Sequence, residues 1–269
     1  MNHRWLLQVY STELRKVLTY RFDFWVNFLV SIFAHVAVAF FLWRAVFDFN
    51  KTETLQGYTF AGLMFYYLMV PMVDKIVYGT GLGFVSRDIY DGSLTRYLIY
   101  PVSFFKYKYI QHIANTTIFI LQLLFTIFMF FQFFGRPADV ALSPSSIAMG
   151  ISAALFSGFL SFFIFTSIEL TAFWADNVWT LVVMLRFCIS LMGGTLVPLA
   201  FFPEGWREAL RFLPFPYLVA FPIECFMGKV GLINWAMGLA IILAWSAVFF
   251  LILNFIWNRG KYRYTGVGI

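Results

Sequence analysis

Six long apolar stretches constrain this chain more than any other feature of its sequence. They cover residues 24–47, 58–78, 110–134, 147–173, 178–200 and 232–257. A helix of about 20 residues, rising 1.5 Å per residue, crosses the roughly 30 Å hydrocarbon core of a bilayer. Only 12% of the residues are charged, about half the share found in soluble domains. We therefore predict an all-α polytopic membrane protein with six transmembrane helices in a single domain, residues 1–269.

The distribution of lysine and arginine predicts the orientation. If the N-terminus lies inside, the inner segments hold eleven basic residues: Arg4, Arg15, Lys16, Arg21, Arg87, Arg96, Lys106, Lys108, Arg259, Lys261 and Arg263. The outer segments then hold five: Lys51, Arg136, Arg207, Arg211 and Lys229. Because basic residues concentrate in cytoplasmic segments, we expect both termini and the central loop to be cytoplasmic. The net charge of +6 suits anionic lipid headgroups, and because these residues flank apolar segments we expect no nucleic-acid partner.

Residues 1–22 precede the first apolar stretch. Leu7, Tyr10 and Leu14 recur there at helical spacing, with polar residues elsewhere around the helix. This pattern predicts an amphipathic helix on the cytoplasmic membrane surface, although a helix packed on a partner protein would show the same periodicity. Charged residues interrupt the apolar ones, so the segment does not resemble a cleavable signal peptide.

The loop at residues 79–109 is the one sizeable polar segment between two of the apolar stretches. It carries four charges within ten residues: Arg87, Asp88, Asp91 and Arg96. Gly92 follows Asp91, a pair typical of turns, because glycine accepts a positive φ. We predict that Ser93 caps a short helix over residues 94–100 and that Pro101 ends it. These features suit a docking surface, although a solvated connector would also be polar.

The stretch from Arg87 to Ser103, RDIYDGSLTRYLIYPVS, resembles the cytoplasmic loop of type 2 ABC-transporter permeases, in the six-span branch that includes daunorubicin-resistance-like exporters. Tyr90, Thr95 and Tyr100 stand where that branch more often has charged residues. The resemblance extends to the proline-rich segment after residue 196 and to the tail Tyr262–Gly266. It implies an export permease of the bacterial cytoplasmic (inner) membrane, working with a second permease subunit, identical or a sibling, and with a cytoplasmic ABC ATPase dimer.

The resemblance also assigns roles within the chain. The loop residues Arg87, Asp88, Asp91, Gly92, Ser93 and Arg96 would couple the ATPase to the spans. The chain itself would need no cofactor, because ATP and magnesium would bind to the partner ATPase. The chain has no Gly-x-x-x-x-Gly-Lys-Ser/Thr sequence that would cradle ATP phosphates. Its three histidines and two cysteines lack metal-ligand spacing, so we expect neither a metal site nor a catalytic residue.

Residues 201–231 interrupt the pattern of long apolar stretches. Prolines forbid one continuous helix there, so we predict two short helices that enter the outer leaflet or lie on it. Irregular backbone in a membrane must be covered by protein or water. The resemblance likewise implies re-entrant helices before the last span, at the outer mouth of the transport path. The residues that mark this region are Pro198, Phe202, Pro203, Pro214 and Phe215; an ordinary amphipathic loop is the alternative.

Ionisable residues within the apolar stretches are functional candidates, because a membrane tolerates them only when they are paired or hydrated. A short turn separates the fourth and fifth stretches, which places Glu169 and Arg186 at similar depth on neighbouring helices. We predict that these two residues form an ion pair that braces the spans, with direct contact to the substrate as the alternative. Asp74 and Lys75 lie near the inner end of the second stretch and are expected to reach the interface instead.

Two other classes of protein must be weighed against an ABC permease. A secondary transporter or channel that works alone would show broken or charged spans in repeated halves, and no such repeat is evident. An integral-membrane transferase would need convergent acid, base or metal groups, and none occur at recognisable spacing. An ATPase that copurifies with the chain would distinguish the permease from both.

Overall fold

The computed structural model describes residues 4–19, 21–79, 81–100 and 102–266. The α-helices are α1 (Arg4–Thr19), α2 (Arg21–Asn50), α3 (Phe60–Tyr78), α4 (Phe84–Tyr90), α5 (Leu94–Ile99), α6 (Phe104–Phe134), α7 (Pro144–Glu169), α8 (Trp179–Met192), α9 (Glu204–Leu210), α10 (Ala220–Phe226) and α11 (Leu232–Gly260). Short 3₁₀ helices are η1 (Leu170–Phe173), η2 (Leu199–Phe201) and η3 (Phe215–Tyr217). A small hairpin pairs β1 (Thr54–Leu55) with β2 (Tyr58–Thr59).

This architecture confirms the predicted all-α polytopic fold. Within the described residues, five helices are long and apolar enough to span a membrane: α2, α3, α6, α7 and α11. The fifth predicted span, residues 178–200, is too long, because α8 ends at Met192 and is a shorter apolar helix. The chain turns at Gly194, whose φ of 84° is easy only for glycine. The hydroxyls of Tyr66 and Tyr67 then donate to the carbonyls of Gly194 and Leu196, at 2.8 Å each.

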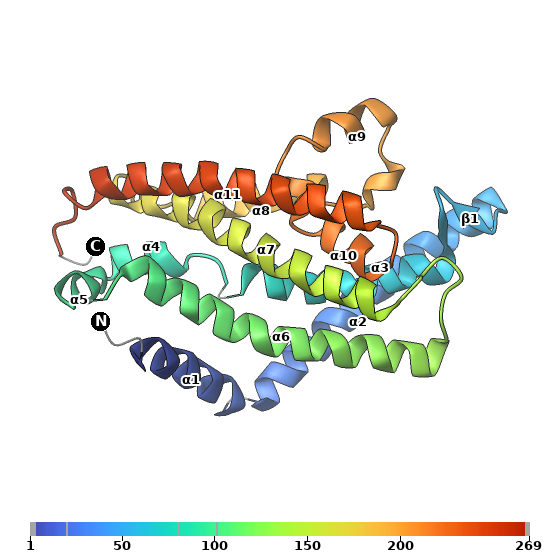
Figure 1. The fold of residues 1–269 in the computed structure, drawn as a ribbon, viewed down its shortest axis with the longest axis horizontal. Coiled ribbons are helices and arrows are strands. Elements are labelled where there is room, and N and C mark those ends of the chain that lie inside the picture. The colour runs from blue at the N-terminus through green and yellow to red at the C-terminus, as the bar shows by residue number, and fades with distance from the viewer. Residues whose placement is uncertain (1–3, 20, 80, 101, 267–269) are drawn as a thin grey trace.

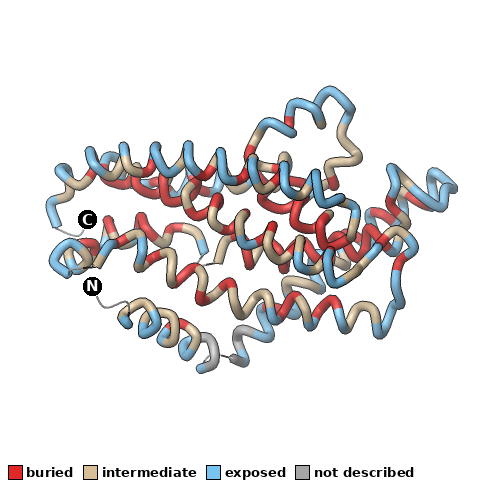
Figure 2. Tube along the Cα trace, viewed as in Figure 1, coloured by how far each residue is buried: buried red, intermediate tan, exposed pale blue. Residues whose placement is uncertain are grey.

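The core of the bundle lies around α3, α7 and α10 (Figure 2). Most of α3 is buried, whereas α2 and α11 expose large apolar side chains along much of their length. The buried face of α7 carries small residues. A side chain at Gly150 would overlap the ring of Phe226 in α10, because its Cβ would lie 2.5 Å from ring atoms. Close packing of helices through small residues is typical of membrane bundles. The outer helices therefore present apolar surface that water would not tolerate but lipid would.

One end of the bundle brings together segments that are far apart in the sequence. The start of α1, the end of the chain after α11, and the helices α4 and α5 all lie there (Figure 1). The β1–β2 hairpin and the connection between α6 and α7 lie at the opposite end. Between them, α1 packs along α6, where the Tyr10 hydroxyl donates to Thr117 at 3.1 Å and Gln111 donates to Glu13 at 2.6 Å.

The segment before α11 forms two short helices, α9 and α10, joined by η3 (Figure 1). Its predicted marker residues stand at boundaries: Pro198 and Phe202 flank η2, Pro203 precedes α9, Pro214 precedes η3 and Phe215 begins it. Proline suits such positions because it lacks an N–H and fixes φ. The two helices differ in burial: α9 projects from the side of the bundle, whereas most of α10 is buried, with Ala220, Ile223 and Phe226 fully so.

Candidate functional site

The polar loop folds into α4 and α5, which we call the docking unit (residues 84–99). Gly92 turns the chain between them with a φ of 70°, as the Asp-Gly pair predicted. The predicted cap by Ser93 is wrong: its hydroxyl makes no capping bond and instead donates to Asp88 Oδ1 at 3.1 Å. This bond holds the two helices together across the turn. Pro101, the predicted end of the second helix, lies outside the described residues.

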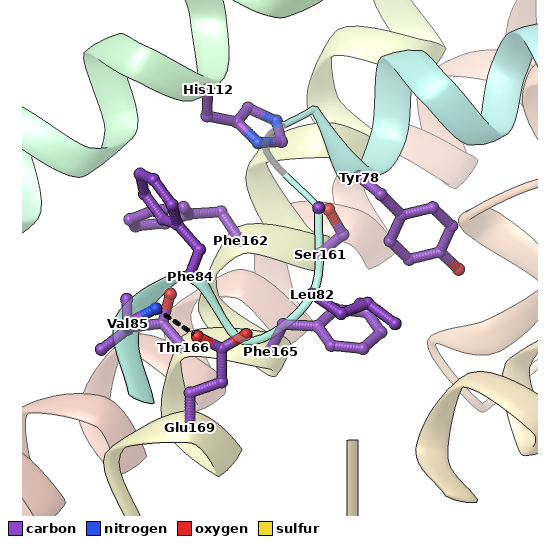
Figure 3. Close-up of a pocket in the computed structure, with 11 residues that line it drawn as sticks. Tyr78, Leu82, Phe84, Val85, His112, Ser161, Phe162, Phe165, Thr166 and Glu169 are labelled. Carbon is purple, nitrogen blue, oxygen red and sulfur yellow. Dashed lines mark hydrogen bonds between the residues drawn. The ribbon is translucent and has the colours of Figure 1, made fainter. Parts of the chain in front are cut away.

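Glu169 at the end of α7 holds the start of α4. Its carboxylate accepts hydrogen bonds from three backbone N–H groups, those of Gly83 at 2.9 Å, Val85 at 2.5 Å and Ser86 at 3.3 Å. Figure 3 shows the bond from Val85. These N–H groups open a helix and have no partner within it. A carboxylate is a strong acceptor for them and is also favoured by the helix dipole. Glu169 therefore acts as a fixed anchor between a membrane span and the docking unit.

An ion pair also anchors the docking unit. Lys108 of α6 lies 2.5 Å from Asp88, and both side chains are largely buried. The Lys108 ammonium also lies over the ring of Phe84, 3.7 Å from its centroid. The structure therefore corrects the view of Asp88 as a free docking charge, because its carboxylate is already engaged within the chain.

Two tyrosine hydroxyls tie the docking unit to neighbouring segments. Tyr90 donates to the carbonyl of Ala175 at 2.8 Å and accepts from the N–H of Val178 at 3.1 Å. Burial raises the pKa of Tyr90. Tyr264 in the tail donates to the Gly92 carbonyl at 2.7 Å and accepts from the Thr95 N–H at 3.0 Å. The docking unit is thus bonded to α6, α7, the α7–α8 connection and the tail.

Beneath the docking unit lies a separate apolar cluster. Val85, Ile89 and Leu94 pack there against residues of η1, α6 and α11. The other side of the unit is exposed: Arg87, Asp91 and Arg96 point charges outward, and Leu98 and Ile99 add apolar surface with exposed fractions of 48% and 74%. A rigid base with an exposed face of mixed character is suited to binding a protein partner. Sequence reasoning missed Leu98 and Ile99 because apolar residues beside apolar spans are not distinctive.

The predicted pair between Glu169 and Arg186 is wrong. Arg186 instead lies 2.7 Å from Asp74 of α3, and its guanidinium stacks on the ring of Tyr78 at 3.7 Å. Asp74 and Tyr78 are one helical turn apart, so they face Arg186 together. The prediction used only the positions of Glu169 and Arg186 along their helices. The sequence did not show toward which neighbouring helix each side chain points. Asp74, which we expected to reach the interface, is the true partner.

A cavity of about 30 Å³ lies between the docking unit and the spans, lined among others by His112, Ser161 and Glu169 (Figure 3). Ligand pockets measure about 300–1,000 Å³, so this one is too small for a transported molecule. No group of three or more potential metal ligands occurs in the described parts of the chain.

A bundle of apolar helices with an anchored two-helix unit at one end defines a multi-pass membrane protein. The chain belongs to the ABC-2 family of transporter proteins, whose family model matches residues 33–268. It is therefore a multi-pass membrane permease of ABC transport. Members of this family form the membrane component of the transporter and are not themselves catalytic. No curated protein and no solved structure matches the chain.

Proposed function

We propose that this chain is the permease subunit of an ABC exporter and that its docking unit receives the motion of a separate cytoplasmic ATPase dimer. The observation that supports this most directly is that the docking unit is bonded to four other segments: α6, α7, the α7–α8 connection and the tail. A connector that only linked two spans would not need it. A unit that must transmit force does, because a loose contact would absorb the motion of the ATPase.

The proposal divides the work between chains. ATP and magnesium would bind to the ATPase, and a second permease subunit, identical or a sibling, would complete the substrate path between the two permeases. The complex would lie in the bacterial cytoplasmic membrane. The test is copurification of the ATPase with the wild-type chain, followed by ATP-dependent transport in proteoliposomes. Transport by the chain alone, driven by an ion gradient, would favour a secondary transporter instead.

Replacing Gly92 with valine is expected to weaken ATPase binding about tenfold, because a φ of 70° costs a side-chain-bearing residue roughly 1–2 kcal/mol and distorts the turn. The matched control is Gly57→Val in the hairpin at the opposite end, where φ is 78° and no atom lies within 4 Å of an added Cβ. Both variants carry the same kind of strain. In a pull-down, the Gly92 variant should bind less ATPase than the Gly57 variant. Equal binding by both variants would indicate that the docking unit only connects two spans.

The proposed orientation predicts that the docking unit and tail are cytoplasmic and that Ala138 is outside. Ser93 itself is half-buried, so we choose its exposed neighbour Arg96 for labelling. In a chain whose Cys188 and Cys225 are replaced by alanine, an impermeant thiol reagent added to sealed cells should label Ala138→Cys and not Arg96→Cys. The reverse pattern would invert the topology.

A further inference from the structure

A large cavity lies between the projecting helix α9 and the membrane span α11, apart from the docking unit. Its volume is about 720 Å³, within the range of sites that bind small molecules. Trp245 of α11 holds the segment after α9 in place, because its Nε1 donates to the carbonyl of Phe212 at 3.0 Å. The cavity is therefore a feature of the folded chain and not a gap beside a free loop.

Positive charge dominates the lining of this cavity. Its charged members are Arg207, Arg211 and Lys229, opposed only by Glu224. Lys229 is already engaged, since it lies 3.6 Å from Asp139 and over the ring of Tyr58. The two arginines are one helical turn apart, so they can face one ligand together.

The arginines have little internal compensation. In the described part of the chain, no hydrogen bond or ion pair engages the Arg211 side chain, and Arg207 approaches only the exposed Glu204, at 3.9 Å. The Nε of Arg207 is buried and has no hydrogen-bond partner among the described residues. Guanidinium groups bind the oxygens of a phosphate or a carboxylate with two parallel hydrogen bonds, so the two arginines suit the phosphate of a ligand.

The rest of the lining is apolar and continuous with the lipid-facing surface. Phe221 of α10 and Met237 and Ile241 of α11 line the cavity, and α11 exposes apolar side chains such as Met237 and Leu243 nearby. A small soluble anion would gain nothing from these residues, whereas a lipid would bury its chains against them. We propose that this cavity binds a membrane phospholipid of net negative charge, with the phosphate on Arg207 and Arg211 and the chains against α11.

The charge of Glu224 should change the affinity of this cavity for an anionic lipid. Its carboxyl lines the cavity, and no described group donates a hydrogen bond to its side chain. Burial raises the pKa of Glu224 to about 7, and Lys229 partly offsets that rise. The other titratable groups that face Glu224 are Tyr58, Tyr66 and Cys225. Above pH 7 the ionised carboxylate would repel an anionic headgroup, and below pH 7 the neutral acid would not.

The test uses phosphatidylglycerol that carries a fluorescent label on one acyl chain. Its fluorescence anisotropy is measured in detergent while the purified protein is added. Arg207→Gln with Arg211→Gln should weaken binding about tenfold or more, because charge-assisted hydrogen bonds are lost. Arg136→Gln, an exposed arginine at the same end of the bundle, is the matched control and should change binding less than twofold. Equal loss in both variants would overturn the site.

Two further comparisons guard against a folding artefact and a different ligand. Glu224→Gln should tighten binding at pH 8 and remove the gain that the wild type shows on going to pH 6, and an unfolded variant could not bind more tightly. Weaker binding by Glu224→Gln would overturn the anionic assignment. Unlabelled phosphatidylcholine and 10 mM inorganic phosphate should displace the probe poorly; efficient displacement by phosphate would show a free-anion site, and by phosphatidylcholine a non-selective one. None of these results depends on the ATPase, so they stand or fall apart from the proposed function.

Discussion

Replacing Glu169 with alanine is expected to lower ATPase binding about tenfold or more while the chain still inserts into the membrane. The substitution leaves three N–H groups at the start of α4 without their acceptor. Each buried donor that loses its partner costs about 1–3 kcal/mol. Because only the α7 anchor is removed, the spans should keep their packing and the docking unit should lose its fixed position.

The measurement is copurification of the ATPase with each variant, together with the melting temperature of the permease in detergent. Glu169→Gln keeps an amide oxygen as acceptor and should retain part of the binding. Glu208→Ala removes an exposed acidic residue at α9 and serves as the matched control. If Glu169→Ala binds the ATPase as the wild type does, the anchor is not needed for docking.

Local sequence signals predicted the turn of the docking unit and its second helix, but not its first, α4. The Asp-Gly turn appears where expected because a positive φ is a property of one residue, and glycine adopts it without strain. Prolines likewise mark the boundaries of η2, α9 and η3, since a residue without an N–H suits the position before a helix or its first turn. Pro71 within α3 is an exception. Five of the six apolar stretches became long helices for a similar reason, because hydropathy alone decides whether a helix suits a membrane.

Long-range partners could not be predicted in the same way. Glu169 bonds to residues more than 80 positions away, and nothing in its neighbours signals that α4 will begin beside it. The chain after α8 is bonded to Tyr66 and Tyr67 of α3. Because the sequence does not show these contacts, the predicted span extended to residue 200, beyond the end of α8 at Met192. The cap by Ser93 failed because its backbone is already helical, with φ −70° and ψ −15°, whereas a capping residue is usually extended so that its oxygen can accept from an N–H.

The ion pair between Asp74 and Arg186, which also joins distant parts of the sequence, makes the sharpest test. Replacing Asp74 with asparagine or Arg186 with glutamine is expected to destabilise the permease, since removing one partner of a buried ion pair leaves the other charge uncompensated. Such losses are about 3–5 kcal/mol for fully buried pairs. The Arg186 side chain is 30% exposed, so we expect the lower end of that range.

The double variant Asp74→Asn with Arg186→Gln should recover part of the loss, because neither charge is then left alone. Melting temperatures in detergent for the wild type, both single variants and the double variant give the coupling energy between the two side chains. A parallel cycle with Glu169→Gln and Arg186→Gln provides the control, since Glu169 bonds to α4 and Arg186 to α3. We expect clear coupling in the first cycle and values near zero in the second. Coupling confined to the second cycle would restore the Glu169–Arg186 pair and remove Asp74 as the brace between α3 and α8.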